Sequence, residues 1–422
     1  SEADEESLHT QLADEAICIG PGPSAQSYLN MEQIISATMV SGADAIHPGF
    51  GFLSENARFA ELCEKCGITF VGPPSKVIRM LGNKKIARST MIAAGVPVVP
   101  GSEGDVEDIE TGLKEAERIG YPVIIKAALG GGGKGMRVAN TPEEFPEAYA
   151  TARKESEIAF GDGTMYIEHF VVNPRHIEFQ ILADSFGNVI HLGERDCSIQ
   201  RNHQKMIEES PSAAVSPELR EKMGHAAVTA AKAAGYVNAG TIEFLLEPDG
   251  KFWFMEMNTR IQVEHPVTEW VTGIDLVKEQ LKIASGMPLE IAQEDVRIQG
   301  HAIECRINAE NPQKNFRPSP GTIQGAHFPG GNGIRVDTCV YNGCKIPPYY
   351  DSMLAKLIVH AGNRKEAIAK MQSALGEVII DGIDTNIDYQ YEILKDEDYQ
   401  SGNFDTGFLA SHIIAGVKIN EN

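Results

Sequence analysis

Hydrophobic and polar positions alternate along two stretches in the middle of the chain, which predicts a β-hairpin. The strands are Thr241–Glu247 and Phe252–Asn258, which together are rich in Ile, Phe, Trp and Leu. The Pro-Asp-Gly-Lys sequence between them is typical of a turn between strands. If Pro248–Lys251 forms a four-residue loop, Glu243 lies opposite Glu256.

Two facing acids on a strand pair predict a bound cation. Directly opposed like charges destabilise a sheet, whereas a divalent cation held by carboxylate and amide oxygens reverses the sign of the interaction. Period two places Asn258 on the same face as Glu256, so Glu243 completes a set of three oxygen ligands for magnesium. The alternative is that both acids face solvent, as a strand Glu usually does.

The first 72 residues alternate helical patterns with short apolar strands, such as Ala45–Ile46 and Thr69–Val71, which predicts an α/β layer. A doubly wound domain normally opens on a strand and a helix, whereas this chain opens on polar residues, so we expect one element to be missing. Residues 47–56 (HPGFGFLSEN) combine close glycines with a helix-start signal at Ser54 and Glu55. They fit a ligand-approaching loop and an ordinary strand-to-helix turn equally well.

A glycine-rich loop separates two predicted strands, Tyr121–Ala128 and Met136–Ala139. Its GxGxxG match does not predict a dinucleotide site, because that fingerprint opens a helix and here a strand follows. A Walker A loop is excluded because Gly135, in place of Ser or Thr, follows Lys134. A strand-loop-strand flap can close its N–H groups over nucleotide phosphates, with Lys126 adding positive charge. The alternative is a mobile surface hairpin.

Further strands are predicted at Thr164–Val172, Ile177–Ala183 and Val189–Leu192. The segment after them crowds basic and polar groups into an otherwise acidic protein, which favours an anion site. Its members are Arg195, Gln200, Arg201, His203 and Lys205.

Composition narrows the class of protein. The chain has 422 residues with 42% hydrophobic content, enough for roughly two to three domains. With 37 basic and 59 acidic residues, its net charge of -22 argues against a nucleic-acid partner. No apolar run approaches the roughly 18 residues of a membrane span, and the acidic opening is unlike a signal peptide, so we expect a cytoplasmic protein with no membrane partner.

Seven cysteines in a chain of this length indicate a reducing compartment rather than a disulfide scaffold. Cys63 and Cys66 form a single CxxC on a helical pattern that ends at Gly67. No second pair completes a zinc site, so both are interpreted as helix-packing cysteines.

Beyond about residue 299 the pattern becomes strand-rich, with predicted strands and turns in residues 319–331 and 333–343. A helix is then predicted over Arg364–Leu375, with Ile368 and Met371 on one face.

Six segments carry a resemblance to biotin carboxylase, a family of the ATP-grasp superfamily. They are HPGFGFLSEN, KAALGGGGKGM, ERDCSIQRNHQK, EMNTRIQVEHPVTE, GHAIECRINAE and PPYYDSMLAKL, in the family's order. The resemblance implies a mixed α/β ATP-grasp architecture. Its parts would be a Rossmann-like N-terminal domain (1–72, first element missing), an ATP-grasp domain (73–298) with a mobile lid (98–170), and a strand-rich C-terminal domain (299–422).

The resemblance also implies the groups that bind ATP. The phosphates would be contacted by Lys84, Lys126 and the flap residues Gly131, Gly132, Gly133, Lys134, Gly135 and Met136. Glu168 and His169 would lie beside the adenine, and Leu245 would pack on it. The ribose and phosphates would be contacted by His176, Gln200 and His203. Magnesium or manganese would bind Glu243, Glu256 and Asn258, in agreement with the hairpin pattern.

For the other substrates, the resemblance implies that Lys205 and Arg260 bind bicarbonate. Glu264 would act as the general base and Arg306 would stabilise the biotin enolate. Gln262, Val263 and Phe50 would lie beside bicarbonate and biotin. An arginine fork suits a planar oxyanion, and Glu264 can reach the same place, four residues beyond Arg260.

The implied reaction is ATP-dependent carboxylation of carrier-linked biotin by bicarbonate through carboxyphosphate, the first half-reaction of acetyl-CoA carboxylase in fatty acid synthesis. A biotin carboxyl carrier protein and carboxyltransferase subunits are the implied partners of a homodimer, since the chain shows neither a biotin-attachment motif nor a carboxyltransferase domain. The alternatives are another acyl-CoA or pyruvate carboxylase, a carbamoyl-phosphate-synthetase-like ligase, or a silent nucleotide-binding subunit.

The chain departs from the family's pattern at three places. The usual opening strand, glycine turn and helix are absent, which affects the first sheet and part of the dimer contact. Phe50 stands where the family often has Tyr, and this keeps an aromatic face beside biotin. His169 stands where many relatives carry Lys, which weakens a hydrogen bond to the adenine.

Overall fold

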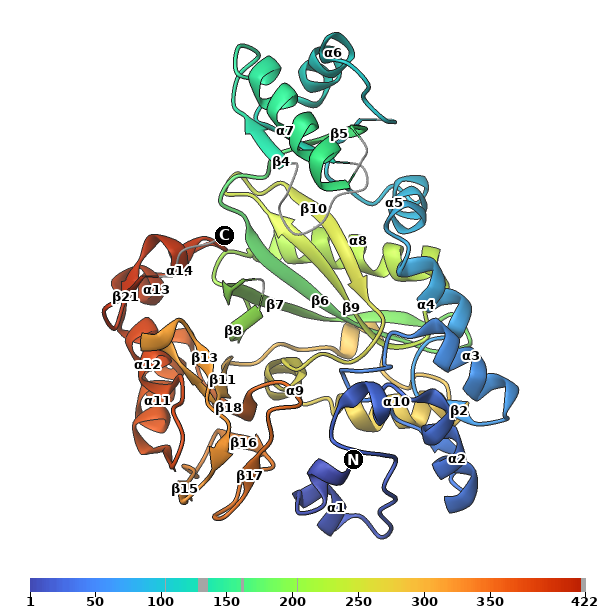
Figure 1. The fold of residues 1–422 in the computed structure, drawn as a ribbon, viewed down its shortest axis with the longest axis vertical. Helices are drawn as coiled ribbons and strands as arrows, with labels where there is room; N and C mark the ends of the chain where they lie inside the picture. Colours follow the sequence, from blue (N-terminus) through green and yellow to red (C-terminus); the bar gives the residue numbers. More distant parts are fainter. Residues whose placement is uncertain (103, 128–135, 161–162, 203, 419–422) are drawn as a thin grey trace. The chain divides into compact units, whose positions relative to one another are not determined.

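The computed structural model describes residues 1–102, 104–127, 136–160, 163–202 and 204–418 (Figure 1). The chain divides into two compact units. The first comprises Ser1–Val96, Arg175–Phe244 and the chain from Glu256 onward, and the second comprises Pro97–Pro174 and Leu245–Met255. A search of the described residues finds no helix whose length and hydropathy would let it cross a membrane.

The described residues form one sheet of eight strands, and the neighbours from β6 to β16 pair antiparallel. In spatial order the strands are β10 (Phe252–Asn258), β9 (Asn238–Leu246), β6 (Arg175–Ala183), β7 (Val189–Arg201), β8 (Gln204–Ser210), β11 (His301–Asn308), β18 (Met353–Ala361) and β16 (Ile334–Thr338). The predicted strand Val189–Leu192 is too short, because β7 continues to Arg201 and carries the polar residues that follow. Of the segment expected to be an anion-binding stretch after a strand, Arg195, Gln200 and Arg201 therefore lie on β7, and Lys205 lies on β8.

One face of β11 and β18 forms an apolar core with two helices. Ile303, Cys305 and Ile307 are spaced by two along β11, and they pack with Leu357 and Val359 of β18. The helices α11 (Arg364–Glu377) and α12 (Ile387–Lys395) cover this face (Figure 1). The helix predicted from residue 364 is confirmed, and its Ile368, Met371 and Leu375 are buried in this core.

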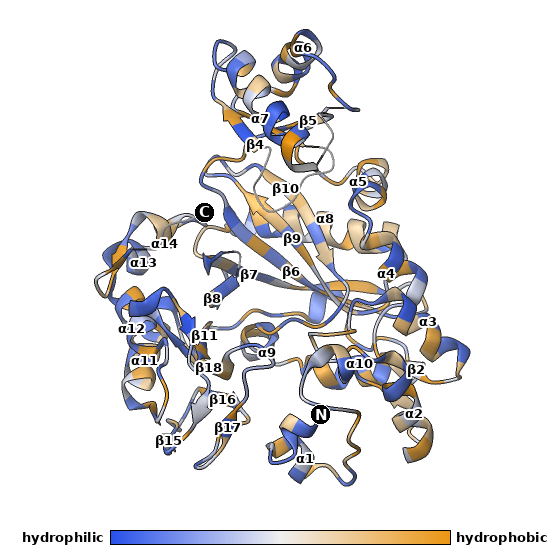
Figure 2. Ribbon diagram, viewed as in Figure 1, coloured by the Kyte–Doolittle hydropathy of each residue, from blue (hydrophilic) through white to orange (hydrophobic). Residues whose placement is uncertain are grey.

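The opposite face of β11 is polar, because the intervening residues Glu304 and Arg306 point to it. Helix α9 (His265–Thr272) lies over this face, and its Val267 and Val271 pack with Ala302 and Ile358. Hydrophilic segments interrupt the hydrophobic ones along β6 and β7 as well (Figure 2). The sheet thus carries charged groups on a covered face.

The N-terminal layer contains the parallel pair β1 (Ala45–Ile46) and β2 (Thr69–Phe70). Strand β1 is as predicted, and β2 is one residue shorter than predicted. The helix after residues 47–56 begins later than expected, because Asn56 rather than Ser54 or Glu55 is its N-cap. Cys63 is buried, but Cys66 is exposed, so the interpretation of both as packing cysteines is wrong for Cys66.

The other helices of the first unit are α1 (Leu8–Leu12), α2 (Met31–Ser41), α3 (Ala57–Lys65), α4 (Ser75–Leu81), α5 (Lys84–Ala93), α8 (Pro217–Ala234), α10 (Leu276–Ala284), α13 (Glu397–Ser401) and α14 (Phe408–Ser411). Its short strand pairs are β12 (Glu310–Asn311) with β13 (Arg317–Pro318), β14 (Gly321–Thr322) with β17 (Lys345–Ile346), β15 (Gly325–His327) with β19 (Ile379–Asp381), and β20 (Ile413–Ile414) with β21 (Val417–Lys418). These pairs and β16 confirm the strand-rich pattern predicted beyond residue 299.

The second unit has a sheet of three described strands in the order β4 (Met136–Ala139), β3 (Val123–Ala127) and β5 (Met165–His169). Helices α6 (Ile109–Ile119) and α7 (Phe145–Phe160) complete it, with Val123, Ile125 and Ile167 in the core. The predicted strand Met136–Ala139 is confirmed, whereas β3 and β5 are shorter than predicted. The flap glycines lie outside the described residues.

The turn of the central hairpin has three residues, not four. The N–H of Glu247 donates to the carbonyl of Lys251 at 2.8 Å, and the N–H of Gly250 donates to the carbonyl of Glu247 at 3.0 Å. Gly250 has φ 87°, which glycine adopts without strain in a turn followed by a bulge. Phe254 and Met257 are buried while the two residues between them are exposed, so the strict alternation used for prediction fails there.

The core under α11 should respond strongly to truncation. We expect Leu357→Ala to lower the free energy of unfolding by about 2–5 kcal/mol, because Leu357 is fully buried and a cavity would remain. Leu12→Ala is the matched control, with a side chain 79% exposed and an expected change within about 0.5 kcal/mol. Urea denaturation of both variants measures the difference, and equal losses would contradict the assignment of this core.

Candidate active site

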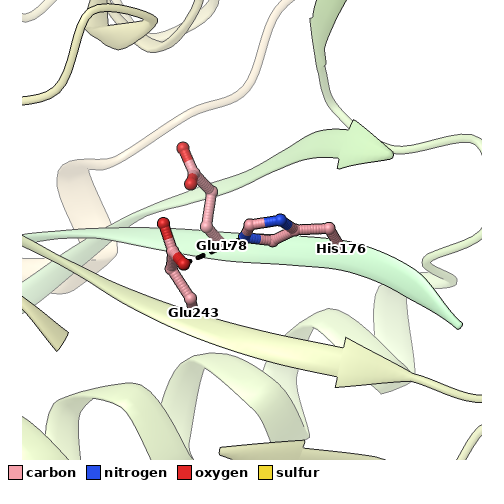
Figure 3. Close-up of side chains that lie close together, drawn as sticks. All are labelled: His176, Glu178 and Glu243. Atoms are coloured by element: carbon pink, nitrogen blue, oxygen red, sulfur yellow. Dashed lines mark ion pairs between the residues drawn. The ribbon is translucent and has the colours of Figure 1, made fainter. Parts of the chain in front are cut away.

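Three titratable side chains converge in the middle of the sheet (Figure 3). His176 and Glu178 are two residues apart on β6, so they share a face, and Glu243 approaches from β9. Their ligand atoms lie within 4.8 Å of one another, and the His176 Nε2 to Glu243 Oε2 distance is 3.1 Å. All three side chains are buried. Such a cluster of acids requires a compensating positive charge.

Lys205 supplies that charge from β8. Its Nζ lies 2.5 Å from Glu178 Oε2, 3.0 Å from Glu243 Oε1 and 2.6 Å from Glu264 Oε1, so all three of its donors face carboxylates. Burial by itself lowers the pKa of Lys205, but Glu178 and Glu264 outweigh it and hold this pKa well above the usual value. The ammonium group therefore joins these three acids.

Arg195 of β7 is completely buried, and each of its five N–H groups has an acceptor. Nε donates to Glu178 Oε1 at 2.5 Å, and Nη2 donates to Gln262 Oε1 at 2.9 Å and to Thr241 Oγ1 at 3.1 Å. Nη1 donates to Gln180 Oε1 at 2.7 Å and to Thr268 Oγ1 at 2.9 Å. Arg195 thus has no donor left for a substrate, and it orients groups that touch Lys205 and Glu243.

Gln262 shows this orientation. Because its Oε1 accepts from Arg195, its Nε2 points the other way and donates to Glu243 Oε1 at 2.9 Å. Glu178 is bridged in the same manner, with one oxygen on Arg195 and the other on Lys205. The buried guanidinium of Arg195 therefore fixes the orientation of Gln262, which contacts Glu243, and of Glu178, which contacts Lys205.

Arg306 of β11 links this cluster to a further acid. Its Nη2 donates to Glu264 Oε2 at 2.9 Å, and its Nε donates to Glu208 Oε1 at 2.6 Å. Burial raises the pKa of Glu264, but Lys205 and then Arg306 outweigh it and hold this pKa well below its usual value. Glu264 is consequently a carboxylate with a cation on each oxygen, and it lies just before α9.

Two of the predicted magnesium ligands, Asn258 and Glu243, are in contact, and the third, Glu256, is exposed. Asn258 Nδ2 donates to Glu243 Oε1 at 2.8 Å, and its Oδ1 accepts from Arg260 Nη2 at 3.3 Å. The pKa of Glu256 is raised, first by desolvation and then by the charge of Glu243, while Lys84 opposes the rise. A cation would relieve that repulsion, so the two carboxylates fit Mg²⁺, and Asn258 fits once its amide oxygen leaves Arg260.

Arg260 is oriented by the N-terminal layer. Its Nε lies 3.1 Å from Glu55 Oε2, and the same carboxylate accepts the N–H of Thr259 at 2.9 Å. Phe50, in the same segment as Glu55, is 38% exposed. The carbonyl of Val263 accepts a hydrogen bond from Lys356 at 3.0 Å.

Of the predicted ATP contacts in the first unit, Lys84 is the first residue of α5, and Gln200 stands opposite Lys205 in the β7–β8 register. In the second unit Lys126 and Glu168 form an ion pair of 2.5 Å. His169 Nε2 lies 3.6 Å from Glu247 Oε1, and its ring meets Trp253 edge-on.

Two of the remaining predicted ATP contacts are described residues. Met136 stands opposite Lys126 in the β3–β4 register, and Leu245 is half-buried. The other predicted contacts, Gly131, Gly132, Gly133, Lys134, Gly135 and His203, lie outside the described residues.

Sequence reasoning missed several groups of this site, namely Glu178, Gln180, Glu208 and Thr241, and it assigned Arg195 only to an anion site. A signal existed for Glu178, because it lies two residues beyond His176 on a strand and so shares its face. No comparable signal existed for Glu208, whose partner Arg306 is 98 residues away in the chain.

The antiparallel sheet, the separate unit with strands β3, β4 and β5, and this charge cluster define an enzyme of the ATP-grasp class. Residues 83–292 match the family model of the carbamoyl-phosphate synthase L chain ATP-binding domain. Residues 1–78 match the biotin carboxylase N-terminal domain and residues 304–411 match the biotin carboxylase C-terminal domain. The chain belongs to the biotin carboxylase family, and the predicted fold class is confirmed.

Individual relatives agree with this assignment. Biotin carboxylase 1 of Bacillus subtilis is 57% identical over 99% of this chain and 93% of its own length. A pyruvate carboxylase subunit of Methanothermobacter thermautotrophicus is 53% identical over 97% of this chain and 83% of its own. The biotin carboxylase domain dimer of Hydrogenobacter thermophilus 2-oxoglutarate carboxylase, solved with MgADP, ADP and bicarbonate, is 50% identical with TM-score 0.85, covering 98% of this chain and 91% of that one.

Because Arg195 donates five buried hydrogen bonds, its substitution should cause a large loss of stability. We expect Arg195→Met to lower the free energy of unfolding by about 3–5 kcal/mol, because Glu178 would keep a buried charge without one of its partners. Arg79→Met is the control, since Arg79 makes an exposed ion pair with Glu61 worth less than about 1 kcal/mol. Denaturant titration of both variants tests the assignment, and a loss at Arg195 no larger than at Arg79 would refute it.

Proposed function

We propose that this biotin carboxylase transfers the carboxyl group of bicarbonate to biotin on a carrier protein, with ATP as the energy source, in the first half-reaction of acetyl-CoA carboxylase. The observation that carries the proposal is the chain of contacts Lys205–Glu264–Arg306, which places a carboxylate between two cations at 2.6 and 2.9 Å. One cation suits bicarbonate, the other suits the biotin enolate, and the carboxylate between them can accept a proton.

In the first stage, Lys205 and Arg260 hold bicarbonate while one of its oxygens attacks the γ-phosphorus of ATP. The bond from that phosphorus to the bridging oxygen of ADP breaks, which gives carboxyphosphate and ADP. Lys205 donates to three carboxylates in the described structure, so it must exchange one of them for bicarbonate. We expect Glu243 to be the carboxylate that Lys205 releases, because Glu243 would also bind Mg²⁺ together with Glu256 and Asn258.

Bound there, Mg²⁺ would neutralise charge on the phosphoryl oxygens. On the ATP side, Lys84, Lys126, His176, Gln200 and His203 with the glycine flap would contact the phosphates and ribose, and Glu168, His169 and Leu245 the adenine. A closed flap would exclude water, which would otherwise hydrolyse carboxyphosphate.

In the second stage carboxyphosphate breaks down to carbon dioxide and phosphate, and N1′ of biotin attacks the carbon dioxide as its proton leaves. Arg306 stabilises the negative charge that develops on the ureido oxygen of biotin. Phe50, Gln262 and Val263 would line the place of the biotin ring.

Glu264 is a weak base while Lys205 and Arg306 both pair with it, since these cations hold its pKa well below the usual value. Their transfer to bicarbonate and biotin removes that effect and raises the basicity of Glu264 at the moment when a proton must be accepted. The released phosphate is the alternative acceptor for the proton of N1′.

The partners follow from the reaction. A biotinylated carrier protein would deliver the substrate and a carboxyltransferase would use the product, and the chain would act as a homodimer in the cytoplasm. The solved dimer of a similar domain supports self-association. Because similar proteins include a 2-oxoglutarate carboxylase domain and a pyruvate carboxylase subunit, carriers from these systems are the competing substrates.

The activity can be tested with purified protein, ATP, Mg²⁺ and bicarbonate. We expect free biotin to stimulate phosphate release and to become carboxylated, and a biotinylated carrier of acetyl-CoA carboxylase to give a higher kcat/KM than carriers of pyruvate or 2-oxoglutarate carboxylase. Stimulation by ammonia in place of biotin would contradict the proposal and favour a carbamoyl-phosphate-synthetase-like ligase. ATP binding without turnover would favour a silent subunit.

The role of Glu264 predicts a separation of binding from chemistry. We expect Glu264→Gln to bind ATP with unchanged affinity and to lose biotin carboxylation by about 10²–10⁴-fold, because a positioned base is removed. Glu110→Gln is the control, because Glu110 is on an exposed helix surface with only Lys114 as its ion-pair partner among the described residues. Calorimetry with ATP and a carboxylation assay measure the two effects, and full carboxylation activity in Glu264→Gln would exclude Glu264 as the base.

A further inference from the structure

Two buried glutamates face each other directly beside Arg306. Glu208 of β8 and Glu304 of β11 are register partners in an antiparallel pair, so their side chains share one face of the sheet. Both residues have 0% of their surface exposed. This is the face covered by α9, on which Arg306 also lies. Two carboxyl groups in this arrangement cannot both be ionised without a large penalty.

The carboxyl oxygens of Glu208 and Glu304 accept few hydrogen bonds. Glu208 Oε1 accepts from Arg306 Nε at 2.6 Å. Among the described residues, Glu208 Oε2 and both carboxyl oxygens of Glu304 receive no hydrogen bond. Four buried oxygens therefore share one donor, although buried polar atoms are nearly always paired. If one of the two carboxyl groups is protonated, its O–H can donate a hydrogen bond to an oxygen of the other group. That bond gives a partner to one oxygen of each group.

The surrounding cations are engaged elsewhere. Lys356, opposite Arg306 on β18, has its Nζ 3.2 Å from Asp337 Oδ2 and 3.0 Å from the carbonyl of Val263. Arg306 pairs with Glu264 as well as with Glu208. The other titratable groups near the pair are Lys205 of β8 and Cys197 of β7, while Cys305 lies on the opposite face of β11. No group in this set is a free cation that could neutralise a second carboxylate.

We propose that Glu304 is protonated in the folded protein and donates a hydrogen bond to Glu208, and that this neutral acid is a positioning residue for Arg306. The proton itself is independent of the proposed function, whereas the role at Arg306 rests on it. An ionised Glu304 would be a third carboxylate beside Arg306, in addition to Glu208 and Glu264, and would compete with an anionic substrate for the guanidinium. The neutral acid instead holds Glu208 in place on Nε.

The electrostatics of the pair agree with this geometry. Burial raises the pKa of Glu304 well above its usual value, Lys356 opposes the rise, and the charge of Glu208 adds to it. Burial likewise raises the pKa of Glu208 to about 7, against the effect of Arg306. The two carboxyls titrate as a pair, in which the first proton to bind is shared.

The raised pKa values of the two carboxyl groups determine how the free energy of unfolding changes with pH. The folded state then binds protons that the unfolded state releases near the usual glutamate pKa. The stability from these protons is complete below that value, and it is lost as pH rises through about 7 and beyond. Removal of the titrating group should therefore favour the folded state increasingly at higher pH.

Infrared spectroscopy of the full chain without substrates tests the proton directly. We expect a carboxylic acid C=O band at pH 7 that shifts in D2O and disappears in Glu304→Gln. Glu110→Gln, which changes an exposed carboxyl, should leave that band unchanged. The melting temperature of Glu304→Gln minus that of the unsubstituted protein should increase from pH 5 to pH 9. Absence of the band, its survival in Glu304→Gln, or a melting difference independent of pH would overturn the proposal.

A second comparison tests the positioning of Arg306. Glu304→Leu removes the donor, and we expect its kcat/KM for biotin to fall at least tenfold with ATP affinity unchanged. Glu304→Gln supplies an amide donor to Glu208 and should recover most of that loss. If the infrared band is present but Glu304→Leu carboxylates biotin normally, the positioning role is wrong and the shared proton stands. If the unsubstituted protein does not carboxylate biotin at all, the proposed function fails while the infrared result still decides the proton.

Discussion

The buried ammonium group of Lys205 is the interaction on which the rest of the site depends. It joins Glu178 of β6, Glu243 of β9 and Glu264 before α9, three carboxylates from three separate elements. Without it these acids would repel one another in a place with little access to water, where an unpaired charge is very costly. The strands can therefore carry these acids on a covered face because β8 brings Lys205 to them, together with Arg195 of β7 and Arg306 of β11.

The same pairing occupies the groups that our proposal assigns to the substrates. Lys205 has no free donor among the described contacts, and Glu264 is held between Lys205 and Arg306 with a lowered pKa. In our proposal each substrate replaces one of these internal partners, so binding energy converts a structural ion pair into a catalytic contact. Arg195 remains outside this exchange, since its five hydrogen bonds are all internal, and it preserves the geometry while the others change partners.

The central hairpin shows how far prediction from the sequence could go. Alternation correctly predicted two strands, whereas the magnesium ion expected at Glu243 stays a prediction. The described cation is nevertheless Lys205, 38 residues away in the chain, which the sequence pattern placed in an anion-binding segment. The predicted loop was one residue too long, because a glycine at positive φ permits a tighter turn with a bulge, and period-two counting has no means to detect a bulge.

By itself, the sequence determined the α/β and strand-rich segments, the helix from Arg364 with its buried face, and the ordered motifs that indicate the family. Local propensity and periodicity are properties of neighbouring residues, so they can be recognised in one chain. Only the tertiary structure decided that Glu208 faces Glu304 and that Arg195 spans Glu178 and Gln262. These contacts join strands that are distant along the chain, and their register is set by packing of whole faces against α9 and α11, which no local pattern encodes.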